Sequence, residues 1–169
     1  MDKILRLPVP VYLKRFYESE YSMSAEMLGD TKFIRVHSNT EIGNLISLVS
    51  TYSYEEVSYP KLEAGQVYLS FLYYAKNKSK NILASKLPEM TKQLDKIFRA
   101  RLCMYVSIHC QAFDGYYYTY IAKFLEQSNI KIDVDISKDT ARKIYRDYLE
   151  KNYQKSEREM SEKSVMGQG

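Results

Sequence analysis

The sequence predicts an α+β fold, with short strands and two helices in the N-terminal part and a mainly helical second half. Before residue 75, apolar and polar residues alternate in several stretches, and after residue 86 apolar residues recur every three or four positions. The 169 residues, 45% hydrophobic and 27% charged, suffice for one core. We expect a single compact domain over residues 1–155, with a subdivision near 80–86 as an alternative, and a flexible polar tail over 156–169.

The first element is a strand, because Leu5, Leu7, Val9 and Val11 alternate with Arg6, Pro8 and Pro10. Proline has no backbone N–H to donate, so Pro8 and Pro10 either place this strand at a sheet edge or end it early. A helix follows, with Leu13, Phe16, Tyr17 and Tyr21 at helical spacing, and then a second short strand over residues 33–36.

Ser38 and Glu41 have the spacing of a capping box, in which each side chain bonds the other residue's backbone amide. This predicts a helix beginning at Ser38, whose buried face consists of Ile42, Leu45, Ile46 and Val49. A third strand follows over residues 67–73, and it ends in a lysine-rich loop over residues 75–81.

The second half begins with a long helix that accommodates Pro88 in its first turn. Its apolar stripe consists of Leu87, Met90, Leu94, Ile97, Phe98, Leu102, Tyr105 and Val106. Gly115 and the tyrosines at 116–118 interrupt the helical pattern, and Ile121, Phe124 and Leu125 resume it. The last helix has Ser137 as its N-cap and an apolar face of Ala141, Ile144, Tyr145 and Tyr148.

Composition and motifs point away from membrane proteins and enzymes. There is no apolar run long enough for a signal peptide or a membrane span, so we expect a protein of the cytoplasm. Glycine-rich phosphate loops and nucleophile elbows are absent, and we therefore predict no enzyme activity, no cofactor and no small-molecule substrate. Cys103 and Cys110 lie about 10 Å apart along one helix, too far for a disulfide. His109 is next to Cys110, but we expect the two cysteines to be structural thiols rather than metal ligands.

Basic residues concentrate in the middle of the chain, although the net charge is only +4. Between residues 76 and 101, eight Lys and Arg residues stand against Glu89 and Asp95 alone. The candidate phosphate contacts are Lys76, Lys78, Lys80, Lys92, Lys96 and Arg99, the last three on one helical face. Tyr73, Tyr74 and Tyr105 could stack on bases, the alternative being that these rings belong to the core and the lysines merely solvate the surface.

Residues 116–151 form a second candidate, a pair of helices similar to a helix-turn-helix. The second helix would offer Lys138, Arg142, Lys143 and Arg146 to DNA. The connector is longer than the usual three or four residues and carries Asp133 and Asp135. On a strand, these two carboxylates would lie on one side, as in some metal-dependent nucleases, whereas a solvated turn before the helix is the simpler interpretation.

Two resemblances add to this picture. The order strand, helix, helix over the first 50 residues resembles a ribbon-helix-helix arm, which implies a strand paired across a dimer axis with Lys3 and Arg6 in the major groove. Residues 7–16 (LPVPVYLKRF) and 136–148 (ISKDTARKIYRDY) resemble small proteins of Bacteroidales phages, including crAss-like phages, and of related mobile elements. The second resemblance implies a phage or mobile-element origin, inside a bacterial host cell or in a virion.

We therefore expect a non-enzymatic DNA-binding protein that contacts phosphates through the central basic segment and the last helix. A protein-interaction or virion-structural module is the alternative, because tyrosine, which occurs 17 times, is favoured at protein interfaces. In that case the protein would form homo- or hetero-oligomers.

Overall fold

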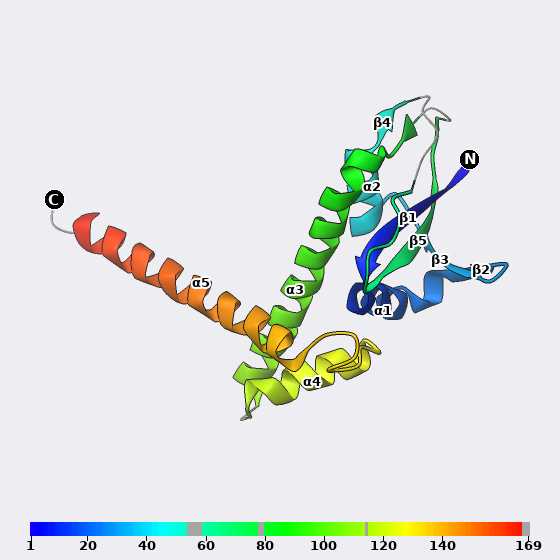
Figure 1. The fold of residues 1–169 in the computed structure, drawn as a ribbon. Helices are drawn as coiled ribbons and strands as arrows, with labels where there is room; N and C mark the ends of the chain where they lie inside the picture. Colours follow the sequence, from blue (N-terminus) through cyan, green and yellow to red (C-terminus); the bar gives the residue numbers. More distant parts are fainter. Residues whose placement is uncertain (54–58, 78–79, 114, 167–169) are drawn as a thin grey trace.

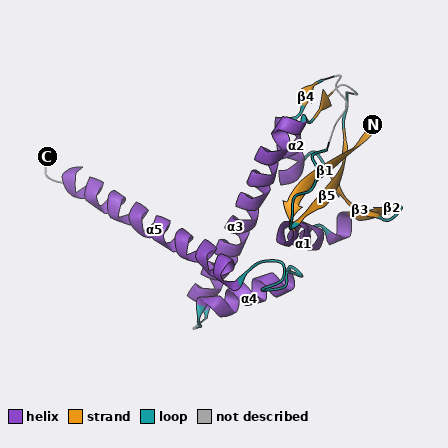
Figure 2. Cartoon of the chain, viewed as in Figure 1, coloured by secondary structure: helices purple, strands orange, loops and turns teal. Residues whose placement is uncertain are grey.

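The computed structural model describes residues 1–53, 59–77, 80–113 and 115–166, with backbone only for residue 80 and residues 156–166. The N-terminal half contains β1 (Asp2–Pro10), α1 (Val11–Glu20), β2 (Ala25–Leu28), β3 (Thr31–Val36), α2 (Glu41–Val49), β4 (Thr51–Tyr52) and β5 (Gln66–Tyr74). After β6 (Lys80–Asn81) come α3 (Leu87–Ala112), α4 (Tyr117–Gln127) and α5 (Lys138–Met166). Single 3-10 turns precede β2 and α3. The fold is α+β, as predicted, and its second half is mostly helical (Figure 2).

The main sheet has four strands in the order β1-β5-β3-β2. β1 and β5 are antiparallel, as are β2 and β3, whereas β3 and β5 run parallel because α2 lies between them in the chain. One face of the sheet is buried, and its side chains include Leu5, Leu7, Leu69, Phe71 and Ile34. Helices α1, α2 and α3 contribute the apolar side chains that cover this face (Figure 1).

The outer edge of β1 is protected, which confirms the prediction that the prolines place this strand at an edge. Met1 and Ala75 exchange backbone hydrogen bonds, so the even-numbered residues of β1 direct their backbone groups away from β5. Pro8 and Pro10 have no donor there, and the carbonyls of Ile4 and Pro8 accept hydrogen bonds from Tyr59 and Thr91 at 2.8 and 3.2 Å. A second strand therefore cannot easily extend the sheet at this edge.

One continuous hydrophobic core runs from the sheet into the helical half. The ring of Phe98 on α3 lies 5.3 Å from Phe16 on α1 and 6.1 Å from Phe124 on α4. Tyr17 is also buried, and its hydroxyl donates to the Leu94 carbonyl at 2.9 Å. These rings join the two halves of the chain.

Helix α3 is the longest element of the core, with 26 residues and a length of about 39 Å. Its N-terminal half packs on the sheet, and Leu102, Cys103 and Val106 in its C-terminal half pack with α4 and α5. Helix α5 leaves this core after about three turns and projects away from it (Figure 1). It continues to Met166, beyond residue 156, where the sequence predicts the tail to begin; the flexibility of residues 156–169 stays a prediction.

Several details of the N-terminal half differ from the sequence-based expectation. The predicted capping box of Ser38 and Glu41 is wrong, because the N-cap of α2 is Thr40. The Thr40 hydroxyl accepts from the Gly43 amide at 3.1 Å. Strand β2 and the short strands β4 and β6 were not predicted, because these segments show no alternating apolar pattern. Strand β1 ends at Pro10, so Val11 belongs to α1 rather than to the predicted strand. The order strand, helix, helix is also interrupted by β2 and β3, and β1 pairs with β5 of its own chain rather than with a copy across a dimer axis. Lys3, one of the two residues assigned to the groove, donates to Asn81 within the chain.

Replacement of Gly43 by alanine tests the close approach between α2 and the preceding turn. A Cβ atom at this position would lie 2.0 Å from the His37 carbonyl oxygen, which is backbone and cannot move aside. We expect Gly43→Ala to lower the free energy of unfolding by about 1–3 kcal/mol, measured by urea denaturation. The matched control is Asn44→Ala, at the adjacent exposed helix position, which we expect to change stability by less than about 0.5 kcal/mol. Equal stability of the two variants would contradict this packing.

The buried tyrosines predict a loss of stability in alkali. Burial and the nearby Asp95 carboxylate raise the pKa of Tyr12 far above the usual 10. Burial and the neighbouring Tyr21 do the same to the pKa of Tyr17, and burial raises the pKa of Tyr73 to about 12. Above about pH 10 the unfolded chain therefore releases tyrosine protons that the folded chain retains, which favours unfolding. We expect the urea midpoint to be constant from about pH 7 to 9 and to fall between about pH 10 and 11.

Tyr17→Phe is the control for this prediction. The variant loses the hydrogen bond to Leu94, so it should be less stable than the parent at pH 8 by about 0.5–1.5 kcal/mol. It should then lose less stability than the parent between about pH 8 and 11, because one of the responsible hydroxyls is missing. An identical decline in both proteins would show that Tyr17 does not contribute.

Candidate nucleic-acid interface

Helices α4 and α5 are joined by a structured connector of ten residues, 128–137, rather than by a tight turn. Helix α4 ends where Asn129 adopts the left-handed conformation, with φ 56°. Ile130 and Ile136 of the connector are buried in the core, and a parallel bridge joins Ile132 to Ile136. The pair is thus more widely spaced than in a helix-turn-helix, whose turn has about three to four residues.

Asp133 and Asp135 hold this connector together. The Asp133 carboxylate accepts from the Lys138 amide at 2.9 Å, and the Asp135 carboxylate accepts from the Lys131 amide at 2.8 Å. Asp135 also lies 3.4 Å from the Arg15 guanidinium on α1, with its side chain only 4% exposed. The two residues therefore form a turn, as the simpler interpretation predicted, but the Asp135 carboxylate is not solvated, and both are engaged in structural bonds rather than aligned on a strand.

Metal ligation has no support in the part of the chain that the structure describes. No group of three His, Cys, Asp or Glu residues within it could hold a metal ion. Cys103 and Cys110 are free, and no disulfide joins them, as predicted. Cys103 is buried, burial raises its pKa to about 11, and its thiol lies 3.9 Å from the Ile144 carbonyl of α5. It is a structural thiol at the contact between α3 and α5.

The first turn of α5 is capped by side chains. The predicted N-cap is confirmed, because the Ser137 hydroxyl accepts from the Thr140 amide at 3.1 Å. The Lys138 amide donates to the Asp133 carboxylate, and the Ala141 amide donates to the Ser137 carbonyl. Since these amides have partners and a carboxylate already lies at the positive end of the helix dipole, the tip of α5 is a poor site for a further anion.

Tyrosines at the start of α4 lie against basic residues at the start of α5. The Tyr116 hydroxyl accepts from the Arg142 guanidinium at 3.2 Å. The Lys138 ammonium lies 4.7 Å from the centre of the Tyr118 ring, and the Arg142 guanidinium lies 5.9 Å from it. These contacts hold two cations and two rings in one surface, which we call the tyrosine–arginine surface and define by Tyr116, Tyr117, Tyr118, Lys138 and Arg142.

Gly115 and the neighbouring rings determine how this surface is built. A Cβ atom at Gly115 would lie 2.6 Å from the Tyr120 hydroxyl, so glycine allows the chain before α4 to pass close to the Tyr120 ring. The Tyr117 ring lies 4.7 Å from Tyr116 and 5.5 Å from Tyr145, which anchors the surface to the core. The Tyr116 hydroxyl and the Arg142 guanidinium beside Tyr117 lower its pKa. Lys138 and Arg142 make this surface electropositive.

A line of exposed side chains continues from this surface along α5. Positions four, seven and eleven residues beyond Arg142 share one helix face and carry Arg146, Leu149 and Tyr153. We call Arg142, Arg146, Leu149 and Tyr153 the α5 stripe. Leu149 is 45% exposed and Tyr153 is 66% exposed. The stripe lies on the side of α5 opposite the buried Ile144, and Tyr145, which contacts Ser107 of α3, lies between the two.

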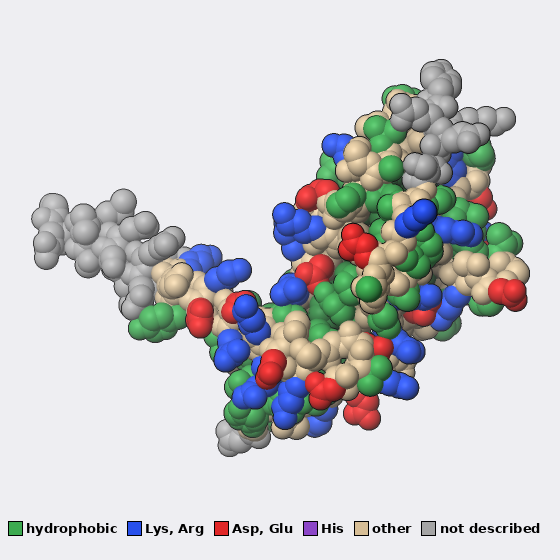
Figure 3. Space-filling model, viewed as in Figure 1, with side chains coloured by type: hydrophobic (Ala, Val, Ile, Leu, Met, Phe, Trp, Pro, Cys, Tyr) green, Lys and Arg blue, Asp and Glu red, His purple; other side chains and the backbone are tan. Residues whose placement is uncertain are grey.

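The central lysines form a separate surface on α3. Lys92, Lys96 and Arg99 are spaced by four and three residues and share one face, and four residues further on the same face Cys103 meets α5. Arg99 is paired with Asp95 at 2.6 Å, which leaves Lys92 and Lys96 as the exposed cations. Figure 3 shows Lys and Arg side chains along the exposed side of α3 and along α5.

Other predicted site residues lie elsewhere. Lys76 is exposed in the loop after β5. Lys78 lies outside the described residues, and only the backbone of Lys80 is described. Lys143 is exposed on α5, on a face beside the α5 stripe. The structure thus brings together Lys138, Arg142 and Arg146 on α5, whereas Lys76 lies in the loop after β5 and Lys92 and Lys96 lie on α3.

The tyrosines first considered as base-stacking groups are mostly part of the core. Tyr73 is 8% exposed, and Tyr105 is half-buried between His109 and Phe124, with ring centres 4.0 and 5.5 Å away. Tyr74 is exposed but lies at the end of β5, on the sheet. Tyr116, which contacts Arg142, and Tyr153, on the same helix face as Arg142 and Arg146, are exposed instead. A helical-wheel comparison of residues 138–153 would have identified the second of these but not the first, which belongs to another element.

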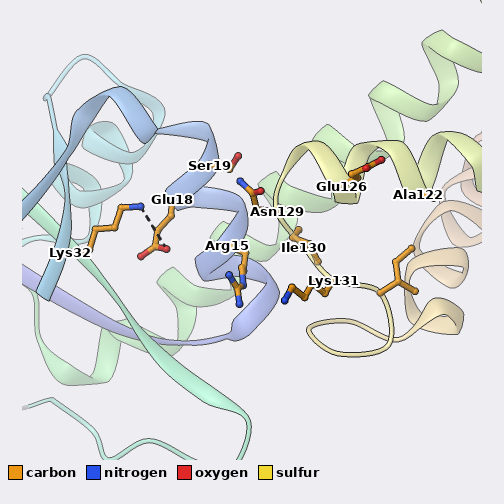
Figure 4. Close-up of a pocket in the computed structure, with 10 residues that line it drawn as sticks. Arg15, Glu18, Ser19, Lys32, Ala122, Glu126, Asn129, Ile130 and Lys131 are labelled. Atoms are coloured by element: carbon orange, nitrogen blue, oxygen red, sulfur yellow. Dashed lines mark ion pairs between the residues drawn. The ribbon is translucent and has the colours of Figure 1, made fainter. Parts of the chain in front are cut away.

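A cleft of about 630 Å³ lies between α1 and the connector (Figure 4). Sequence analysis did not predict it, because its residues come from distant parts of the chain. Two of its three cations have acidic neighbours, because Lys32 lies 4.0 Å from Glu18 and Arg15 pairs with Asp135; Lys131 is the third cation. Glu126 adds a further negative charge. The cleft is therefore of mixed charge and is a poor site for an anionic ligand.

Comparisons with protein-family models, with curated proteins and with solved structures find no match. Among the described residues, no helix is both long enough and apolar enough to cross a membrane.

The connector's role can be tested by replacing Asp133. Asp133→Ala removes the cap of α5 at a position with φ 62°, which alanine rarely adopts, so we expect the free energy of unfolding to fall by about 1–2 kcal/mol. Asp133→Asn keeps an acceptor oxygen and tolerates this conformation, so it should cost less than half as much. Thermal denaturation of the three proteins measures the difference. Equal stability of Asp133→Ala and the parent would contradict the capping role.

Proposed function

We propose that this protein is a non-enzymatic nucleic-acid-binding protein and that it binds through the tyrosine–arginine surface and the α5 stripe. The observation that supports this proposal is the placement of Lys138 and Arg142 on Tyr116 and Tyr118 by two different helices. Basic side chains held by rings are ordered before a ligand arrives, so less conformational entropy is lost on binding a phosphate.

Phosphate contacts account for most of the affinity in this proposal. Arg142 can keep its bond to Tyr116 and still offer further donors, because a guanidinium carries five N–H groups. Arg146 and Lys143 are exposed on adjacent faces of α5 and extend the positive surface. Lys92 and Lys96 on α3 form a second surface, which could neutralise phosphates without recognising bases.

DNA is the first polymer to test. The resemblance of residues 7–16 and 136–148 to proteins of Bacteroidales phages and mobile elements supports DNA as the ligand and the cytoplasm of a bacterial host as the location. The capped tip and the ten-residue connector of α5 argue against the usual helix-turn-helix docking, in which the first turn of the second helix enters the major groove.

Fluorescence anisotropy with labelled DNA at about 50 and 200 mM salt tests the proposal. We expect micromolar or tighter binding at the lower salt concentration, weaker by at least about tenfold at the higher one, because phosphate contacts release counterions. Absence of binding to both single- and double-stranded DNA would overturn the proposal. A defined oligomer indifferent to nucleic acid, observed by sedimentation, would favour the protein-interaction alternative.

Charge-neutralising pairs locate the interface. Arg142→Gln with Arg146→Gln should weaken binding and reduce the slope of log K against log salt by about one to two, since each lost phosphate contact contributes about 0.7 to 0.9. The matched control is Lys14→Gln with Lys61→Gln, which removes the same charge from positions on α1 and in the loop before β5. A third pair, Lys92→Gln with Lys96→Gln, measures the contribution of α3. Equal effects of the first pair and the control would remove α5 from the interface.

A further inference from the structure

The α5 stripe combines the two chemical groups that a single strand of nucleic acid requires. Arg142 and Arg146 offer positive charge, and Tyr116 and Tyr153 offer exposed rings on either side of them, 57% and 66% exposed. From Arg142 to Tyr153 the helix advances about 16 Å. Rings and cations therefore follow one line instead of forming one compact patch.

Tyr116 and Tyr153 are more exposed than the other tyrosines near the α5 cations. Tyr145 is 4% exposed and Tyr117 is half-buried against it, so neither can present a free face. Tyr116 is fixed through its hydroxyl to Arg142, which leaves much of its ring in solvent. Tyr153 lies beyond the core, on the part of α5 that projects away from it (Figure 1). Two of the rings near the cations thus have an open face.

Exposed ring faces are of use only for bases that are not already stacked. In a duplex both faces of each base are covered by neighbours, whereas in a single strand a base can stack on an aromatic side chain while its phosphates pair with Arg or Lys. A helix that enters the major groove of a duplex would instead present polar side chains of its first turn, and the first turn here is capped by Asp133.

We propose that the α5 stripe, together with Tyr116, binds single-stranded nucleic acid, with bases stacked on Tyr116 and Tyr153 and phosphates paired with Arg142 and Arg146. This inference rests on the proposed function and specifies its ligand. DNA and RNA share the chemistry involved, and separate oligonucleotides distinguish them.

Tryptophan substitution provides a direct test, because the chain contains no tryptophan. Tyr153→Trp and Tyr116→Trp each introduce a single reporter whose fluorescence is quenched when a base stacks on it. The matched control is Tyr74→Trp, at a tyrosine that is also 66% exposed but lies on the sheet. The probes are oligo-dT, oligo-U, a DNA duplex and inorganic polyphosphate, which carries the charge of a backbone but no bases. Circular dichroism establishes that each variant is folded.

We expect oligo-dT or oligo-U to quench the fluorescence of the Tyr153→Trp and Tyr116→Trp variants but not that of the Tyr74→Trp control. Polyphosphate should bind, as seen by competition with the labelled oligonucleotide, without quenching either reporter. Tyr153→Ala should weaken single-strand binding about 5- to 100-fold and leave polyphosphate binding unchanged. A stronger effect of oligo-dT than oligo-U would identify DNA as the preferred ligand, and the reverse would identify RNA.

Other results overturn the inference in distinguishable ways. Binding of the duplex and of single strands without quenching of either reporter would exclude base stacking but leave the proposed function intact. Stronger binding of the duplex than of the single strand would exclude the ligand class assigned here. No binding of any nucleic acid, together with a concentration-dependent mass that Tyr153→Ala abolishes, would overturn both proposals and identify the stripe as a contact between copies of this chain.

Discussion

The packing of Phe98 against Phe16 and Phe124 is the constraint on which the rest of the structure depends. Phe98 is fully buried on α3, and its two partners belong to α1 and α4. The same contact therefore seals the helical face of the sheet and fixes α4 against α3. Helix α4 in turn positions α5, because Tyr117 of α4 packs against Tyr145 of α5 and the connector joins the two helices. The contact between Arg142 and Tyr116 therefore also depends on the packing of Phe98.

Electrostatic pairing then determines which basic residues remain available. Arg15, Arg35, Arg99 and Arg101 are all within 3.5 Å of a carboxylate. The Arg101 pairs connect α3 to α1 and α2, and the Arg15 pair connects α1 to the connector. Two cations of α5 have an aromatic neighbour instead, because Lys138 and Arg142 lie on Tyr118. An aromatic partner orders a cation without neutralising it. This distinction, more than the net charge of +4, makes α5 the stronger candidate surface.

Much of the fold could be predicted from the sequence, because β1, α1, β3, β5 and the three long helices each have a clear apolar period. The prolines of β1 even indicated its edge position. The α2 cap was misassigned because Ser38 and Thr40 both suit an N-cap, and the choice depends on the close approach of Gly43 to His37. The position of the α3 lysines relative to α5 could not be predicted, since it depends on where the two helices meet. For the same reason, Tyr116 was not recognised as a partner of Arg142, 26 residues away.

The acidic residues of the connector clarify why basic residues and tyrosines lie together on α5. In the sequence, Asp133 and Asp135 are unfavourable for a nucleic-acid surface, yet their carboxylates are turned to backbone amides and to Arg15. They lie at the N-terminal end of α5, whereas the α5 stripe extends away from that end. Their negative charge is therefore farthest from Arg146 and Tyr153, along the part of α5 that projects from the core. A ligand on this part of α5 would lie away from Asp133 and Asp135 and would still reach Tyr116, because Arg142 contacts Tyr116.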